Sequence, residues 1–68
     1  MRAMKKATFI LGDRDDKRHS TRFNFVELES AEGYEPDALA KVKPSIYVPK
    51  PLAQKANRIR VTIEEIEG

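Results

Sequence analysis

The alternation of apolar and polar residues is clearest near the C-terminus, in Arg58–Glu64. Ile59, Val61 and Ile63 alternate there with charged or hydroxyl-bearing residues. Successive side chains of a strand point to opposite faces, so this pattern predicts a strand with one apolar and one polar face. All three apolar residues are β-branched, which suits a pleated surface better than a helix. We therefore expect the rest of the sheet to be organised around this strand.

A second strand is predicted at Lys6–Leu11. Ala7, Phe9 and Leu11 share one face there, whereas Ile10 lies on the other. An apolar residue on the second face suggests that both sides of this strand are covered. A dimer contact would provide such a cover.

The third predicted strand, Thr21–Glu29, changes phase part-way along. Phe23 and Phe25 share one face, while Val26 and Leu28 take the other. A β-bulge produces such a slip, because two residues of the bulged strand then oppose one residue of the partner. The alternative is a strand that is buried on both faces at its far end.

The remaining segments are short and rich in turn residues. Gly12–Ser20 is polar throughout, too long for a tight hairpin but short enough to join antiparallel neighbours. Pro36–Lys41 allows one helical turn, and Leu52–Asn57 is a loop or a single turn. The fourth strand, Ser45–Val48, lies among prolines, which favours an edge position because proline cannot donate to a ladder.

These patterns predict a single small β-domain over residues 1–68. The fold class is all-β, a four-stranded antiparallel sheet or partly open barrel with at most one short helical turn. No connection carries a convincing crossover helix. The predicted core residues are Ala7, Phe9, Leu11, Phe23, Phe25, Val26, Leu28, Ile46, Val48, Ile59, Val61 and Ile63.

Length and composition make this core thin. A chain of 68 residues buries a modest fraction of its surface, and such domains rely on disulfides, a metal or a partner chain. There is no cysteine and only one histidine, His19, so we expect a homodimer and no cofactor. No apolar run approaches the roughly 18 residues that a membrane span needs. We expect no membrane association and a cytoplasmic location.

One resemblance concerns the last third of the chain. The segment Ile46-Tyr47-Val48-Pro49-Lys50, followed by the Ile59–Glu64 strand, resembles short uncharacterised bacterial proteins. Those proteins carry a Tyr-Val-Pro-Lys segment ahead of an Ile-x-Val-Thr-Ile strand. The resemblance implies no activity and no functional residues.

The residue patterns of the common catalytic and metal sites are not met. Asp13, Asp15 and Asp16 are interleaved with cations, and a calcium loop would need glycine where Arg18 stands. The neighbours His19, Ser20 and Asp16 include the residue types of a catalytic triad, but no glycine-rich elbow accompanies them. The scattered glycines build no phosphate-binding loop. A non-enzymatic protein is therefore expected.

Basic residues are the remaining candidates for function. Charged residues make up 35% of the chain, the net charge is +2 and the pI is about 9.1. Four cations, Arg14, Lys17, Arg18 and Arg22, cluster near the first connection. Cations that neutralise phosphates, together with an aromatic ring for base stacking, are typical of single-strand binders. The candidate nucleic-acid-binding residues are Arg22, Tyr47, Lys50, Arg58 and Arg60.

Two hypotheses follow. The first is a non-enzymatic interaction module that dimerises and contacts another protein, or itself, through strand edges. The second is a small β-type nucleic-acid-binding protein that uses a basic strand face. The second is less favoured, because many glutamates surround the cations and because Lys and Arg on a sheet edge also deter aggregation.

Overall fold

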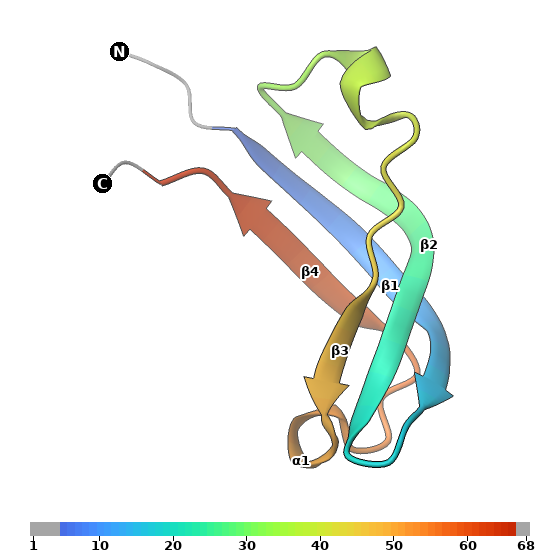
Figure 1. The fold of residues 1–68 in the computed structure, drawn as a ribbon. Coiled ribbons are helices and arrows are strands. Elements are labelled where there is room, and N and C mark those ends of the chain that lie inside the picture. The colour runs from blue at the N-terminus through green and yellow to red at the C-terminus, as the bar shows by residue number, and fades with distance from the viewer. Residues whose placement is uncertain (1–4, 67–68) are drawn as a thin grey trace.

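The computed structural model describes residues 5–66 and confirms the predicted fold class. Four antiparallel strands form one curled, partly open sheet (Figure 1), in the order β3-β2-β1-β4. The strands are β1 (Lys6–Asp16), β2 (Ser20–Glu32), β3 (Ile46–Pro49) and β4 (Ile59–Glu64). A 3-10 turn, η1 (Pro36–Leu39), and a short helix, α1 (Lys50–Ala53), are the other elements of residues 5–66. η1 lies where a helical turn was expected, in Pro36–Lys41. α1 overlaps the predicted loop or single turn at Leu52–Asn57 but begins two residues earlier, at Lys50.

The hairpin of β1 and β2 is longer than predicted. Gly12–Ser20 is not a loop, because β1 continues to Asp16 and only residues 17–19 connect the strands. The turn closes with the amide of Lys17 donating to the carbonyl of Ser20 at 2.8 Å. Asp13 takes a positive φ of 45° where the pairing shifts. A short polar side chain tolerates this conformation, so the strand continues through a charged segment.

The phase change in β2 is a β-bulge, the first of the two predicted alternatives. Phe25 and Glu27 oppose consecutive residues of β1, which leaves Val26 without a partner. Glu29 is left unpaired in the same way further along the strand. Bulges bend a strand and increase its twist, which accounts for the curl of the hairpin in Figure 1.

The hydrophobic core lies on the inner face of the curl and is centred on β1. Ala7, Phe9 and Leu11 are all buried there, and Phe23 from β2 joins them. The Phe9 and Phe25 rings meet edge to face, with 6.4 Å between centroids. Thr8, Thr21 and Ala53 are also buried, which the apolar pattern alone did not indicate. Other hydrophobic side chains pack against this core at partial exposure; they are Tyr34, Leu39, Ile46, Ala56, Ile59 and Val61.

Three predicted core residues are exposed instead. The exposed fractions are 36% for Val26, 38% for Leu28 and 51% for Ile63. Leu28 and Ile63 have the correct phase but lie on the strands that flank β1, where less of the chain covers them. Val26 lies at the bulge, and its side chain turns to the outer face above Gly12.

The expectation that β4 organises the sheet is also wrong. β4 is an edge strand, and β1 and β2 occupy the centre. Alternation identifies a strand with one buried face, but it contains no information about the position of that strand in the sheet. The predicted edge position of β3 is confirmed.

Replacing Leu11 with alanine tests the central position of β1. Leu11 is fully buried, so Leu11→Ala should lower the free energy of unfolding by about 2–5 kcal/mol. Ile66 is 79% exposed, and Ile66→Ala should change it by less than about 0.5 kcal/mol. Urea titrations followed by circular dichroism measure both. Equal effects of the two substitutions would contradict this assignment of the core.

Candidate interaction surface at the β4 edge

β4 forms a regular edge of the sheet, with no strand from residues 5–66 on its outer side. Its pairing with β1 runs without a shift from Lys6 opposite Glu64 to Leu11 opposite Ile59. The amide of Glu65 donates to the carbonyl of Lys5 at 2.8 Å, which identifies these two opposed residues as a hydrogen-bonded pair. Backbone groups alternate in direction along an antiparallel strand. The amides and carbonyls of residues 60, 62 and 64 therefore point away from β1, towards the open edge.

The opposite edge of the sheet is shorter and interrupted by prolines. β3 has four residues, pairs only with Ser20–Phe23 of β2, and ends at Pro49. Proline and short length both deter further strand pairing. The far half of β2 carries the two bulges, which disrupt a flat edge as well. Within residues 5–66, β4 is thus the edge best suited to accept another strand.

The apolar face of the sheet extends to this open edge. Ile59 and Val61 are half-buried against the core, and Ile63 is 51% exposed. The register places them opposite Leu11, Phe9 and Ala7, the buried row of β1. Tyr34 and Leu39, which follow β2 in the chain, pack against the core. No described element lies beyond β4 to cover its apolar row in the same way.

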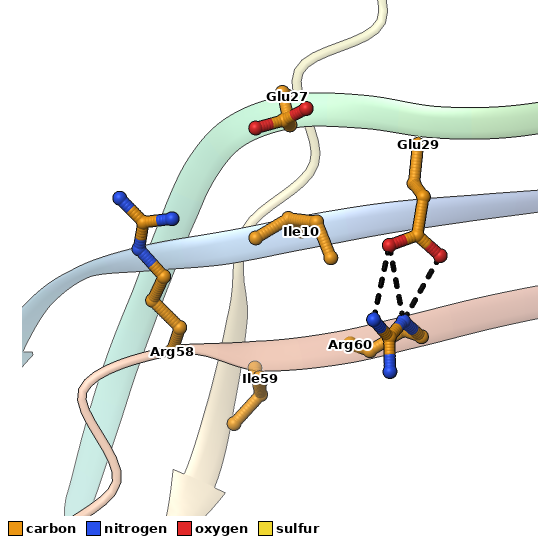
Figure 2. Close-up of a pocket in the computed structure, with 6 residues that line it drawn as sticks. All are labelled: Ile10, Glu27, Glu29, Arg58, Ile59 and Arg60. Atoms are coloured by element: carbon orange, nitrogen blue, oxygen red, sulfur yellow. Dashed lines mark hydrogen bonds and ion pairs between the residues drawn. The ribbon is translucent and has the colours of Figure 1, made fainter.

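The outer face beside β4 forms an open groove of about 400 Å³. Figure 2 shows Ile10 between the charged side chains of β2 and β4. Arg60 reaches over β1 to Glu29, with Nε 2.9 Å from Oε2 and a second guanidinium nitrogen 3.1 Å from Oε1. This carboxylate raises the pKa of Arg60. Arg58 makes no ion pair with any residue between 5 and 66.

The five candidate nucleic-acid-binding residues are divided between the two edges of the sheet. Arg22 and Tyr47 oppose each other across β2 and β3, and the guanidinium lies 5.9 Å from the ring centroid. Arg58 and Arg60 lie at the β4 edge. Lys50 begins α1, where its Nζ lies 3.4 Å from Oδ1 of Asp16. Two of the four cations, Lys50 and Arg60, are thus paired with carboxylates.

Arg14 has a structural role that the sequence analysis missed. Its guanidinium donates to the carbonyls of Ala56 at 2.6 Å and Gln54 at 3.0 Å, and to Asp16 at 2.8 Å. It also lies 5.7 Å from the centroid of the Phe23 ring. These contacts tie the end of β1 to the segment after α1. The i, i+2 spacing of Arg14 and Asp16 in an extended strand was the available signal, because it places both on one face.

Asp15 and Asp16, the two aspartates nearest the turn, serve as ion-pair partners. Asp16 accepts from Thr21 Oγ1 at 2.8 Å as well as from Arg14, and Asp15 pairs with Lys17 at 2.8 Å. Among residues 5–66, no three His, Cys, Asp or Glu side chains are grouped to hold a metal ion. His19 contributes its backbone carbonyl, which accepts from the amide of Lys50.

Comparisons with protein families, curated proteins and solved structures find no match to this chain. The resemblance at Ile46–Lys50 and Ile59–Glu64 therefore stays a prediction. In the described part of the chain, no helix is long and apolar enough to cross a membrane.

The Asp16 network predicts a loss of stability in acid. Hydrogen bonds from Arg14 and Thr21 lower the pKa of Asp16 from 3.8 to about 2. A carboxyl whose pKa is depressed by folding stabilises the fold above its unfolded pKa, and this contribution disappears as the pH falls through the folded pKa. The stability difference between the wild type and Asp16→Asn should therefore narrow as the pH falls from about 4 to about 2. Urea midpoints measured across this range test it, and a constant difference would contradict the role of Asp16.

Proposed function

We propose that this protein is a non-enzymatic interaction module that forms a homodimer through the β4 edge. The observation that carries the proposal is the coincidence of two features on one strand. The backbone groups of β4 at residues 60, 62 and 64 have no strand partner within residues 5–66, and the apolar row of β4 is incompletely buried. A strand added beside β4 would hydrogen-bond to these backbone groups and would bury more of the apolar row.

Strand addition is a recognised mode of protein recognition. Main-chain hydrogen bonds supply affinity, and alternate side chains supply specificity. Here the added strand would extend the inner apolar face past Ile59, Val61 and Ile63. Burial of apolar surface contributes about 25 cal/mol per Å², so covering the 51% exposed side chain of Ile63 would favour association.

A second copy of the chain is the partner that the composition favours. The chain has no cysteine, and its fully buried apolar side chains are few, which leaves association as the means to complete the core. A two-fold dimer joins the same edge of both copies, so one open strand suffices. The lack of cysteine also fits a cytoplasmic location, where disulfides are rare.

Proline at position 62 tests the dimer. The Thr62 amide points away from β1, so Thr62→Pro would remove a donor from the open edge and leave the β1 ladder unchanged. Wild type should elute as a dimer at about 100 µM in size exclusion with light scattering, and Thr62→Pro as a folded monomer. Thr62→Val keeps the amide and should remain dimeric.

A second variant covers the case in which Thr62→Pro fails to fold. Ile63→Lys places a charge on the exposed end of the apolar row, and it should shift the protein to monomer while the circular dichroism spectrum stays native. A monomeric wild type at 100 µM, or dimers that survive both substitutions, would contradict the proposal.

A second candidate function is supported by the cation–π pair of Arg22 and Tyr47. Tyr47 is 59% exposed and lies beside a cation, an arrangement that suits stacking with a nucleic-acid base. Fluorescence anisotropy with labelled single-stranded oligonucleotides over a salt series tests it. Binding should weaken with salt and fall further in Arg22→Glu and Tyr47→Ala. Lys6→Glu, an exposed cation at the opposite end of the β1–β2 hairpin, is the matched charge control. No association at low salt would eliminate this candidate.

A further inference from the structure

The alternation of β4 restricts how two copies could pair, and we infer an antiparallel dimer whose two-fold axis passes beside Val61. In this arrangement Arg58 of each copy faces Glu64 of the other. The inference rests on the proposed function, because it specifies the partner and the register of the β4 edge.

Two requirements select the possible registers. Residues that exchange hydrogen bonds across the new edge must be those whose backbone groups point outward, at positions 60, 62 and 64. The apolar row of one copy must also continue the apolar row of the other, because a slip by one residue moves every side chain to the opposite face. An axis that falls between two residues would pair odd-numbered positions with even-numbered ones. It therefore fails both requirements.

Charge and the length of the paired segment distinguish the two-fold axes that pass beside a residue of β4. An axis beside Arg60 would bring two Arg60 side chains together, and an axis beside Ile63 would leave Ile59 outside the paired region. An axis beside Thr62 would pair Arg60 with Glu64, but Arg60 is already held by both oxygens of Glu29. Like charges directly opposite are unfavourable and opposite charges are favourable in antiparallel pairs.

The axis beside Val61 gives an ion-pair partner to Arg58. Arg58 makes no ion pair with any described residue, and its side chain lies on the outer face, where its Cγ packs near Gly12. In this register Arg58 opposes Glu64 twice, once at each end of the paired segment. On the inner face Ile59 opposes Ile63, and Val61 opposes its own symmetry copy. The apolar rows of the two sheets become continuous.

Charge reversal tests the two ion pairs. Arg58→Glu alone and Glu64→Arg alone should each weaken self-association at least tenfold, because like charges then face each other at both ends. An equimolar mixture of the two variants should form a heterodimer with about wild-type affinity, since both contacts are again complementary. Mass-tagged copies and native mass spectrometry measure the distribution. Lys55→Glu, on an exposed residue after α1, is the charge control and should leave self-association unchanged.

Cysteine substitution locates the axis independently, because the chain contains no cysteine. Opposed residues of a pair without mutual hydrogen bonds lie with Cα atoms about 4.5 Å apart, within the range of a disulfide. Val61→Cys should therefore form a disulfide-linked dimer on oxidation, and Thr62→Cys should form much less. Faster cross-linking of Thr62→Cys would overturn the register.

The outcomes separate the two proposals. A wild-type protein that stays monomeric at 100 µM overturns the proposed function and the register together. A wild-type dimer that is disrupted by Thr62→Pro, but whose charge variants show no preference for each other and whose Val61→Cys does not cross-link, overturns the register alone.

Discussion

Burial of the apolar row on β1 is the constraint on which the structure depends. Ala7, Phe9 and Leu11 are covered because β1 has a strand on each side and because Val48 and Ala53 close the inner face. A chain of 68 residues has material to cover one such row fully, but not the rows beside it. Tyr34 and Leu39, which follow β2 in the chain, add partial cover to the core. On the β4 side, no described element does so, and the open edge follows from this shortage.

Polar contacts stabilise the end of the sheet at the β1–β2 turn. The guanidinium of Arg14 spans from β1 to the carbonyls of Gln54 and Ala56, while Asp16 and Thr21 complete the network. Arg14 is half-buried, and backbone carbonyls, the Thr21 hydroxyl and one carboxylate accept from its two terminal guanidinium nitrogens. The cation at this position therefore stabilises the fold. The β4 edge lies away from this network, and it is there that we propose a second copy of the chain pairs.

Local pattern predicted the faces of the strands but not their order. The alternation in β4 correctly placed Ile59 and Val61 inward and Arg60 outward, and the phase slip correctly located the bulge at Val26. The bulge at Glu29 gave no signal, because Ala31 is the sole apolar residue that follows it in β2. The central position of β1 depends on pairing between distant segments, which alternation does not encode. The role of Arg14 was missed because its carbonyl partners lie 40 and 42 residues away.

The most direct test of the account is amide hydrogen exchange along β4. In a monomer, the amides of Ile59, Val61 and Ile63 point towards β1 and are protected by hydrogen bonds to it. The outward amides, those at positions 60, 62 and 64, point to the open edge and exchange freely. Strand pairing between two copies would protect the outward set as well. Exchange measured by NMR at about 1 mM and after dilution should show outward amides that are protected only at the high concentration. Outward amides that exchange rapidly at both concentrations, beside a protected inward set, would contradict self-association through this edge.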